Sequence, residues 1–400
     1  MAQQVEAARR VERADANVEK ADANVVRVPA GTDLVEWYFE QGWTDGLPVV
    51  PPTRERVDAV VEALGGEADF VECKVPPRHG SLSREVLAVN MVMAGCKPEY
   101  APVVRAAMLA LASDAFNLNG VQATTHMAAP LLIVNGPVAR EIGMNGGCNA
   151  FGSGNRANAT IGRALRLVLL NVGGGWPGEL DKSTLGHPGK YTYCVAENEA
   201  ASPWAPYHVE KGFDVEDSTV FVLAAEPPHS VTNHVANDPE GILDSIASAM
   251  STIANNNAVS SGHCAVIIGP EHARTIAGKG WTRHDVRNYL AMYAYNLSLF
   301  RAHFQRALRQ DLQSQSAKMV QARAQGTHSN RAEPRPHPSL CRRRYGRPVF
   351  RLYPRLGSHV LPGAAQHRNR RPKRGAQSAD LCRRHLLSVN YRRPTNDRTR

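Results

Sequence analysis

A histidine, two cysteines and a pair of glutamates are the side chains in this sequence best suited to chemistry. His126 is the first candidate for a general acid or base, because histidine titrates near neutral pH. Cys148 and Cys96 are candidates for a nucleophile or a redox thiol. Glu197 and Glu199 would share one face of a strand and could act together as acid–base groups or as ligands of a metal ion. The alternatives are a hydrogen-bonded structural histidine, inert thiols and solvated carboxylates.

The glycine-rich stretch 145–157, NGGCNAFGSGNRA, is predicted to bind an anion at the start of a buried helix. The helix follows over 158–172, NATIGRALRLVLLNV, and its surface is apolar nearly all round. Backbone N–H groups at a helix N-terminus favour anions, glycines let a ligand approach closely, and a nearby thiol can be acidified. The alternative is a tight turn over a core helix. The predicted substrate-binding or anion-binding residues are Gly147, Asn149, Gly152, Ser153, Gly154, Asn155, Arg156 and Thr125.

Three further stretches are expected to complete the site. In 94–100, AGCKPEY, Cys96 precedes a helix that starts at Pro98, and Lys97 beside it would lower its pKa. The stretch 116–130, FNLNGVQATTHMAAP, is dense in polar side chains that need hydrogen bonds if buried. The polar segment 173–204 is predicted to form the second wall.

The positive net charge of +10 comes from the end of the chain. Residues 327–400 hold 19 Lys and Arg against 3 Asp and Glu, whereas the rest of the chain holds 28 against 34. The body is therefore mildly acidic, and its charge gives no reason to expect nucleic-acid binding. The tail lacks helix or strand periodicity. It is interpreted as a disordered basic arm or, as the preferred hypothesis, a frameshifted reading from about residue 326.

Cysteine usage and hydropathy favour a cytoplasmic protein without a membrane span. Five of the seven cysteines are spread through the body with no C-x-x-C pair, which fits reduced thiols better than disulfides or a zinc site. The longest apolar runs fall far short of the roughly 20 residues that cross a bilayer. No residues single out a cofactor, which stays unknown, or a metal site.

The pattern of apolar strands followed by helices predicts an α/β fold with a largely parallel sheet covered by helices on both faces. Ligand sites in such folds lie at the carboxyl ends of strands, so the loops after Val134, Ala224 and Ile268 are expected to carry the site. Residues 1–30 are predicted to be an N-terminal extension with a flexible helix, residues 31–305 the body, and residues 306–400 the tail. If the body has two sub-domains, the boundary between them is expected near 175–215. Strands are expected at 47–50, 70–75, 131–134, 191–196, 219–224 and 265–268.

The body resembles bacterial proteins of the poorly characterised UGSC-type family, which is related to selenoproteins, and their partner proteins. The stretches that carry the resemblance are TDGLPVVPPTRERV (44–57), AGCKPEY (94–100), GVQATTH (120–126), IVNGP (133–137), NATIGRALRLVLLN (158–171) and residues 189–204. It covers roughly residues 33–295. The naming motif of the family, selenocysteine or cysteine followed by Gly-Ser-Cys, is absent, and no catalytic residues are carried over.

Three functions are therefore considered. The first is a cytoplasmic enzyme, an oxidoreductase or lyase, that acts on a small anionic molecule through His126 and a thiol. The second is a non-catalytic subunit or scaffold of a multi-protein enzyme. The third is a metal-dependent hydrolase that would use His126, His187, Glu197 and His229. The expected partners are a small-molecule substrate and either a second copy of the chain or a partner subunit.

Overall fold

The computed structural model describes residues 25–252, 256 and 263–295. The chain divides into two compact units, Met1–Pro48 and Val49–Arg400. In the first unit, helix α2 (Leu34–Glu40) begins at Asp33, whose side chain accepts hydrogen bonds from the backbone of Val35 and Glu36. Trp37 packs edge-on against Tyr38 and Trp43. The predicted helix in 1–28 and the basic tail lie almost entirely outside the described residues.

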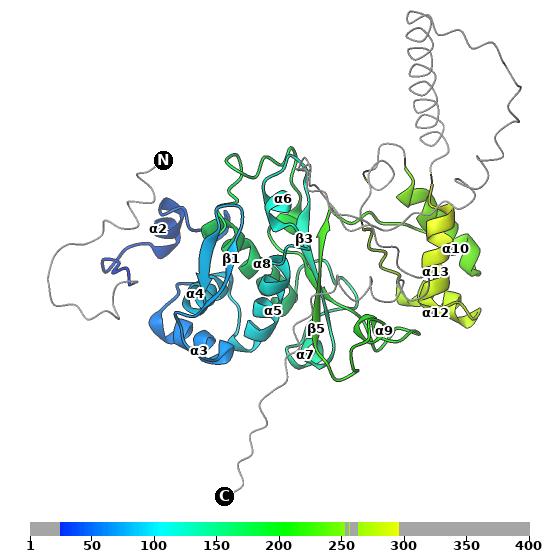
Figure 1. Cartoon of the computed structure of the whole chain (residues 1–400), viewed down its shortest axis with the longest axis horizontal. Helices are drawn as coiled ribbons and strands as arrows, with labels where there is room; N and C mark the ends of the chain where they lie inside the picture. Colours follow the sequence, from blue (N-terminus) through cyan, green and yellow to red (C-terminus); the bar gives the residue numbers. More distant parts are fainter. Residues whose placement is uncertain (1–24, 253–255, 257–262, 296–400) are drawn as a thin grey trace, which may run out of the picture. The chain divides into compact units, whose positions relative to one another are not determined.

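The second unit contains the other helices and all the strands that Figure 1 labels. The α-helices in the first part of this unit are α3 (Arg54–Leu64), α4 (Arg84–Ala94), α5 (Ala101–Leu111), α6 (Leu118–Gln122), α7 (Pro137–Glu141) and α8 (Arg156–Asn171). They are followed by α9 (Tyr207–Glu210), α10 (Pro239–Met250), α12 (Pro270–Gly278) and α13 (Arg283–Tyr293), and the short 3-10 turns are η2 (Pro98–Tyr100) and η3 (Pro188–Lys190). The strands are β1 (Val71–Val75), β2 (Gly80–Ser83), β3 (Ala129–Asn135), β4 (Cys194–Ala196) and β5 (Thr219–Ala225).

Strand β3 is the centre of a three-stranded sheet with the order β4-β3-β5. It runs parallel to β4, with Leu132 opposite Cys194, and antiparallel to β5, with Ala129 opposite Ala225. The carboxyl ends of β3 and β4 therefore meet at one end of the sheet, while β5 ends at the other. The chain thus has α/β content as predicted, but a largely parallel sheet is not confirmed, because the sheets are small and β1–β2 and β3–β5 are antiparallel.

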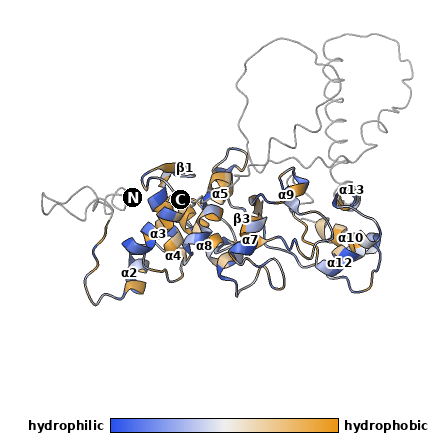
Figure 2. Cartoon of the chain, turned by 90° about the horizontal axis from the view of Figure 1, so that it is seen from below, coloured by the Kyte–Doolittle hydropathy of each residue, from blue (hydrophilic) through white to orange (hydrophobic). Residues whose placement is uncertain are grey.

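Helix α8 is the buried helix that the sequence predicts. The Asn155 side chain caps it by accepting from the Asn158 N–H group, and the helix packs against α4, α5 and β4. Burial of each large aliphatic side chain contributes about 1.5–3 kcal/mol to the free energy of folding, so the buried side chains of α8 stabilise the unit. The helical residues buried there include Ile161, Leu165, Leu167, Val168, Leu169 and Leu170. Figure 2 shows the hydrophobic residues of α4 beside the more hydrophilic α3.

Glu72 ties the β1–β2 hairpin to two helices. Its carboxylate accepts from Arg84 Nε at 2.7 Å and from Arg105 Nε at 2.8 Å, and its side chain is only 3% exposed. Burial alone would raise the pKa of Glu72, but the two guanidinium groups outweigh it and lower the pKa. The carboxylate is therefore held ionised by α4 and α5.

Two strands expected from the sequence form no ladder within the described part of the chain. Residues 47–50 and 265–268 are extended or irregular, and helix α12, which the sequence reading did not predict, follows the second. Among the helices that the structure describes, none combines the length and apolar character needed to cross a bilayer.

Candidate functional site

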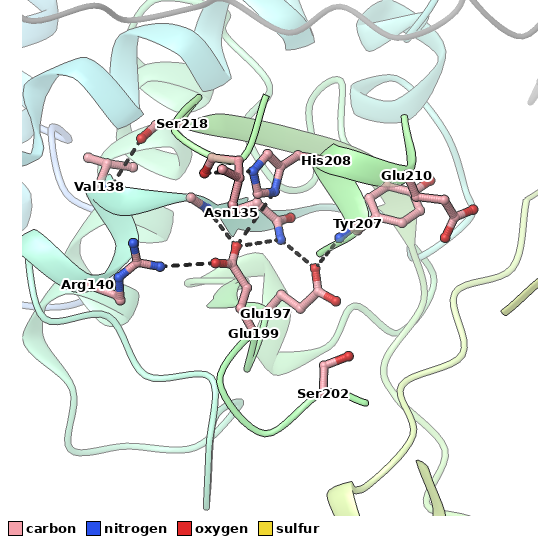
Figure 3. Close-up of polar contacts among 12 residues, drawn as sticks. Asn135, Val138, Arg140, Glu197, Glu199, Ser202, Tyr207, His208, Glu210 and Ser218 are labelled. Atoms are coloured by element: carbon pink, nitrogen blue, oxygen red, sulfur yellow. Dashed lines mark hydrogen bonds and ion pairs between the residues drawn. The ribbon is translucent and has the colours of Figure 1, made fainter. Parts of the chain in front are cut away.

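A network of carboxylates lies where β3 and β4 end (Figure 3). Asn135, the last residue of β3, donates from Nδ2 to both Glu197 and Glu199, the latter at 3.0 Å. Glu199 also accepts from the Gly136 N–H group at 2.7 Å and from Arg140 at 3.2 Å. This is the strand end at which the loop after Val134 was expected to carry a site.

The remaining contacts of this network are to helices α9 and α13. Glu197 accepts from the Tyr207 N–H group at 2.8 Å and, through its other oxygen, from Arg283. Glu210 binds Arg287 at 2.5 Å and lies 3.6 Å from Arg283. Both oxygens of Glu197 are thus engaged, which favours a structural role for this residue over the predicted acid–base role.

The glycine-rich loop 145–157 lies against β4 and Glu197. The Asn145 carbonyl accepts from the Ala196 N–H group at 3.3 Å. A Cβ atom at Gly146 would lie 2.5 Å from the Ala196 carbonyl oxygen, so this glycine is required for backbone packing. The buried Asn158 side chain holds the loop by accepting from the Asn145 N–H group at 3.0 Å and donating to the Ala150 carbonyl at 3.2 Å.

Several of the predicted anion-binding residues have other contacts. Asn155 caps α8 and donates to the Gly143 carbonyl at 2.8 Å. Arg156 donates from Nε and Nη2 to the Gly95 carbonyl at 3.1 and 3.0 Å. Ala150 of the loop packs against the hydrophobic cluster that contains Ala129, and the exposed residues of the loop are Gly147, Cys148, Asn149, Phe151, Gly152, Ser153, Gly154 and Arg156. A pocket floored by loop amides therefore stays a prediction, and the structural role of Asn155 and Arg156 argues against their binding an anion.

The predicted lowering of the Cys96 pKa is wrong. Its thiol is buried beneath α8 and lies 3.2 Å from the Thr160 carbonyl oxygen, to which it donates. Burial raises the pKa of Cys96 to about 12, and the neighbouring Arg156 does not offset this. Burial also raises the pKa of Cys73, Cys194 and Cys264, so Cys148 is the exposed thiol among the described cysteines.

This difference predicts selective alkylation. In the native protein at pH 8, iodoacetamide is expected to modify Cys148 at least about 100 times faster than Cys96, because only a thiolate reacts and it must be accessible. Mass spectrometry of tryptic peptides over time measures both rates. The denatured chain, in which both thiols should react alike, is the control. Equal rates in the native protein would contradict the burial of Cys96.

His126 is paired with a carboxylate that the sequence reading did not single out. Its Nε2 atom lies 2.5 Å from Glu226 Oε1, and the two side chains are 30% and 37% exposed. Glu226 directly follows β5, and Ala225 pairs with Ala129, so strand pairing brings the two residues together across 100 positions of sequence. The sequence signal for Glu226 was its place two residues beyond the end of the strand predicted over 219–224.

Part of the segment 173–204 lies against the residues that precede His126, and its role as a wall of the site stays a prediction. The Lys182 and Thr184 N–H groups donate to the Thr124 and Thr125 carbonyls at 3.1 and 3.0 Å. This segment is anchored by a buried ion pair between Lys190 and Asp181 at 2.6 Å. Burial lowers the Lys190 pKa despite the bond to Asp181. Thr125 is therefore held in place by its backbone carbonyl.

Tyr193 links the His126 pair to the glycine-rich loop. Its hydroxyl donates to the Glu226 carbonyl at 3.1 Å, and its ring packs edge-on against Phe151 and His187. Burial, followed by the charge of Lys190, lowers the pKa of His187, so that ring is neutral near pH 7.

A small cavity lies beside Tyr193. Its volume is about 10 Å³, room for one water molecule, and it is lined by Pro130, Gly162, Leu165, Arg166, Leu169, Gly189 and Tyr193.

His126 and Glu197 do not share a site. His126 lies beyond the start of β3 and Glu197 beside its last residue, so about 20 Å of strand separates them. The proposed grouping of His126 and Glu197 around one metal is therefore wrong. Within the described residues, no three His, Cys, Asp or Glu side chains gather closely enough to hold a metal ion.

Comparison with known proteins gives no family for the chain: no family model, no curated protein and no solved structure matches it.

Proposed function

We propose that this chain is an enzyme that transfers protons on a small anionic molecule, with His126 as the acid–base group. The observation that carries the proposal is the 2.5 Å contact between His126 Nε2 and Glu226. A carboxylate that accepts from one ring nitrogen fixes the tautomer and leaves a lone pair on the other. Nδ1 of His126 has no hydrogen-bond partner among the described residues, and the side chain is partly exposed to solvent.

A lyase reaction fits these groups better than thiol-dependent oxidation. In a lyase step the Nδ1 atom would take a proton from the substrate as a bond to the leaving group breaks, and would then return a proton to that group. Cys96 is unsuited to thiol-dependent oxidation because it is buried. Cys148 is exposed on a loop that reaches the His126 pair indirectly, through Phe151 and Tyr193. The anionic character of the substrate rests on the sequence prediction for the glycine-rich loop 145–157, whose exposed residues include Gly147, Gly152 and Gly154.

The proposal also includes where the protein acts and which family it is related to. We propose a cytoplasmic setting, in keeping with five described cysteines that are all free thiols. We also propose kinship with the UGSC-type family, on the stretches that carry the resemblance.

Solvent deuterium exchange tests the proposal without knowledge of the substrate. The full chain is incubated in D₂O with pools of small carboxylic acids and carbonyl compounds, and proton NMR follows each carbon-bound hydrogen. We expect one compound that raises the melting temperature of the protein to lose the signal of one hydrogen. A compound that stabilises the protein but undergoes neither exchange nor conversion would contradict the proposal and favour a non-catalytic subunit.

A further inference from the structure

Tyr193 is hydrogen-bonded to both of the segments that carry the His126–Glu226 pair. Its backbone carbonyl accepts from the Leu132 N–H group of β3 at 2.9 Å, and its hydroxyl donates to the Glu226 carbonyl at 3.1 Å. His126 precedes β3, which begins at Ala129, and Glu226 directly follows β5. This one residue therefore ties the backbone of Glu226 to the strand that follows His126.

The Tyr193 ring is held firmly in place. It is buried in a hydrophobic cluster whose other buried members are Ala129, Leu131 and Val195. The His187 ring contacts it edge-on, with ring centroids 5.7 Å apart. A Cβ atom at Gly189 would lie 2.8 Å from Tyr193 Cδ1 and 2.5 Å from His187 Cε1, so a glycine is needed here to leave room for both rings. The position of the Tyr193 hydroxyl is thus set by packing on several sides.

The pair itself lies where the strand ladder ends. Ala129 and Ala225 form the last pair of the β3–β5 ladder, so the ladder does not extend to Glu226. The side chains of His126 and Glu226 are 30% and 37% exposed, and a contact between partly exposed side chains contributes little unless both are held in place. The Tyr193 hydroxyl supplies a backbone hydrogen bond at this point.

The Tyr193 hydroxyl is suited to positioning and not to proton transfer. It is bonded to a backbone carbonyl, on the far side of Glu226 from the carboxylate that contacts His126. Burial raises the pKa of Tyr193, so the hydroxyl stays protonated near pH 7 and remains a donor.

We propose that Tyr193 is a positioning residue for the His126–Glu226 pair: it fixes the Glu226 backbone so that the carboxylate stays within hydrogen-bond distance of His126 Nε2. The positioning is a property of the fold, whereas its effect on catalysis rests on the proposed function. Two measurements keep these two claims apart.

NMR of the full chain tests the positioning without a substrate. In protein with ¹⁵N-labelled histidine at about pH 9, well above the ordinary histidine pKa, the Nε2 shift of His126 reports whether the ring donates to a carboxylate. Glu226→Ala gives the value for the ring without that partner. Tyr193→Phe, which keeps the ring and removes the hydroxyl, is expected to move the signal from the wild-type value toward the Glu226→Ala value.

Tyr191→Phe is the matched control, because it removes the hydroxyl of an exposed tyrosine in the same segment and should leave the His126 signal in place. A signal that Tyr193→Phe does not move would overturn the proposal. So would a wild-type signal that already equals the Glu226→Ala value.

Rates of deuterium exchange test the effect on catalysis, with the same pools of small carboxylic acids and carbonyl compounds. Tyr193→Phe is expected to lower kcat about tenfold and to leave KM unchanged, because Tyr193 acts through Glu226. In the Glu226→Ala background the same substitution should have little further effect. Equal losses in both backgrounds would indicate a general effect on the fold and contradict the proposal. If the wild-type protein exchanges no compound, the proposed function fails, and the NMR result alone decides the role of Tyr193.

Discussion

Replacing His126 by asparagine is expected to slow the proposed proton transfer by about 100- to 10,000-fold, the usual contribution of a positioned acid or base. Asparagine keeps a side chain that can donate to Glu226 but has no nitrogen that takes up a proton near neutral pH. The measurement is the rate of deuterium uptake by the compound that the wild-type protein exchanges. His284→Asn, which changes an exposed histidine on α13, is the matched control. Exchange that continues unchanged in the His126 variant would assign the chemistry to another residue.

The Glu226→Gln variant distinguishes two roles of Glu226: orienting the His126 ring and exchanging the proton itself. Glutamine can still accept from Nε2 through its amide oxygen, but it is neutral and stabilises the protonated ring less. The expected loss is smaller, about 10- to 100-fold, the usual effect of changing a group that orients a functional histidine. If the glutamine variant were as impaired as His126→Asn, we would conclude that Glu226 itself exchanges the proton.

Replacing Glu72 by alanine is expected to lower the free energy of unfolding by about 3 kcal/mol, because it leaves two arginines without their buried partner. The expected value is at the lower end for a buried pair, since the Arg105 side chain is one-third exposed. Urea denaturation followed by circular dichroism gives the value. Glu62→Ala, on the exposed side of α3, should change the free energy by less than about 0.5 kcal/mol. An equally small effect at Glu72 would contradict the role of the ion pairs.

The same residue predicts a pH dependence. The two arginines hold the pKa of Glu72 below its ordinary value, even though burial acts in the opposite direction. A group with a lowered folded-state pKa stabilises the fold fully above its unfolded pKa, and this contribution is lost as pH falls through the folded value. The stability difference between wild type and Glu72→Ala should therefore shrink below about pH 4. A difference that stays constant down to acid unfolding would contradict this.

Local signals in the sequence predicted the elements best. Helix α8 follows from its apolar faces and from Asn155, which does cap it, and β3 and β5 follow from short apolar runs. Strand direction could not be predicted, because the long connection between β4 and β5, which contains the short helix α9, allows either orientation. The antiparallel course of β5 moves the loop after Ala224 to the opposite end of the sheet from the loop after Val134.

Site chemistry was harder to predict because it depends on contacts between distant segments. Lys97 beside Cys96 is visible in the sequence, but the α8 backbone that covers the thiol lies more than 60 residues away. His126 was selected by residue type, whereas Glu226 became apparent only once β3 and β5 were paired. The charge balance around Glu197 likewise depends on Arg283, a residue of α13.

The pairing of β3 with β5 makes the His126–Glu226 contact sensitive to register. Insertions in the exposed turn at residues 214–216, between α9 and β5, leave the ladder intact and need not alter the contact, since loop closure costs little more for a longer loop. Deletion of one residue within 219–225 would instead reverse the face on which the following side chains point and move Glu226 away from the ring. Variation in length among natural or engineered versions of this chain should therefore be tolerated in that turn and excluded from the two strands.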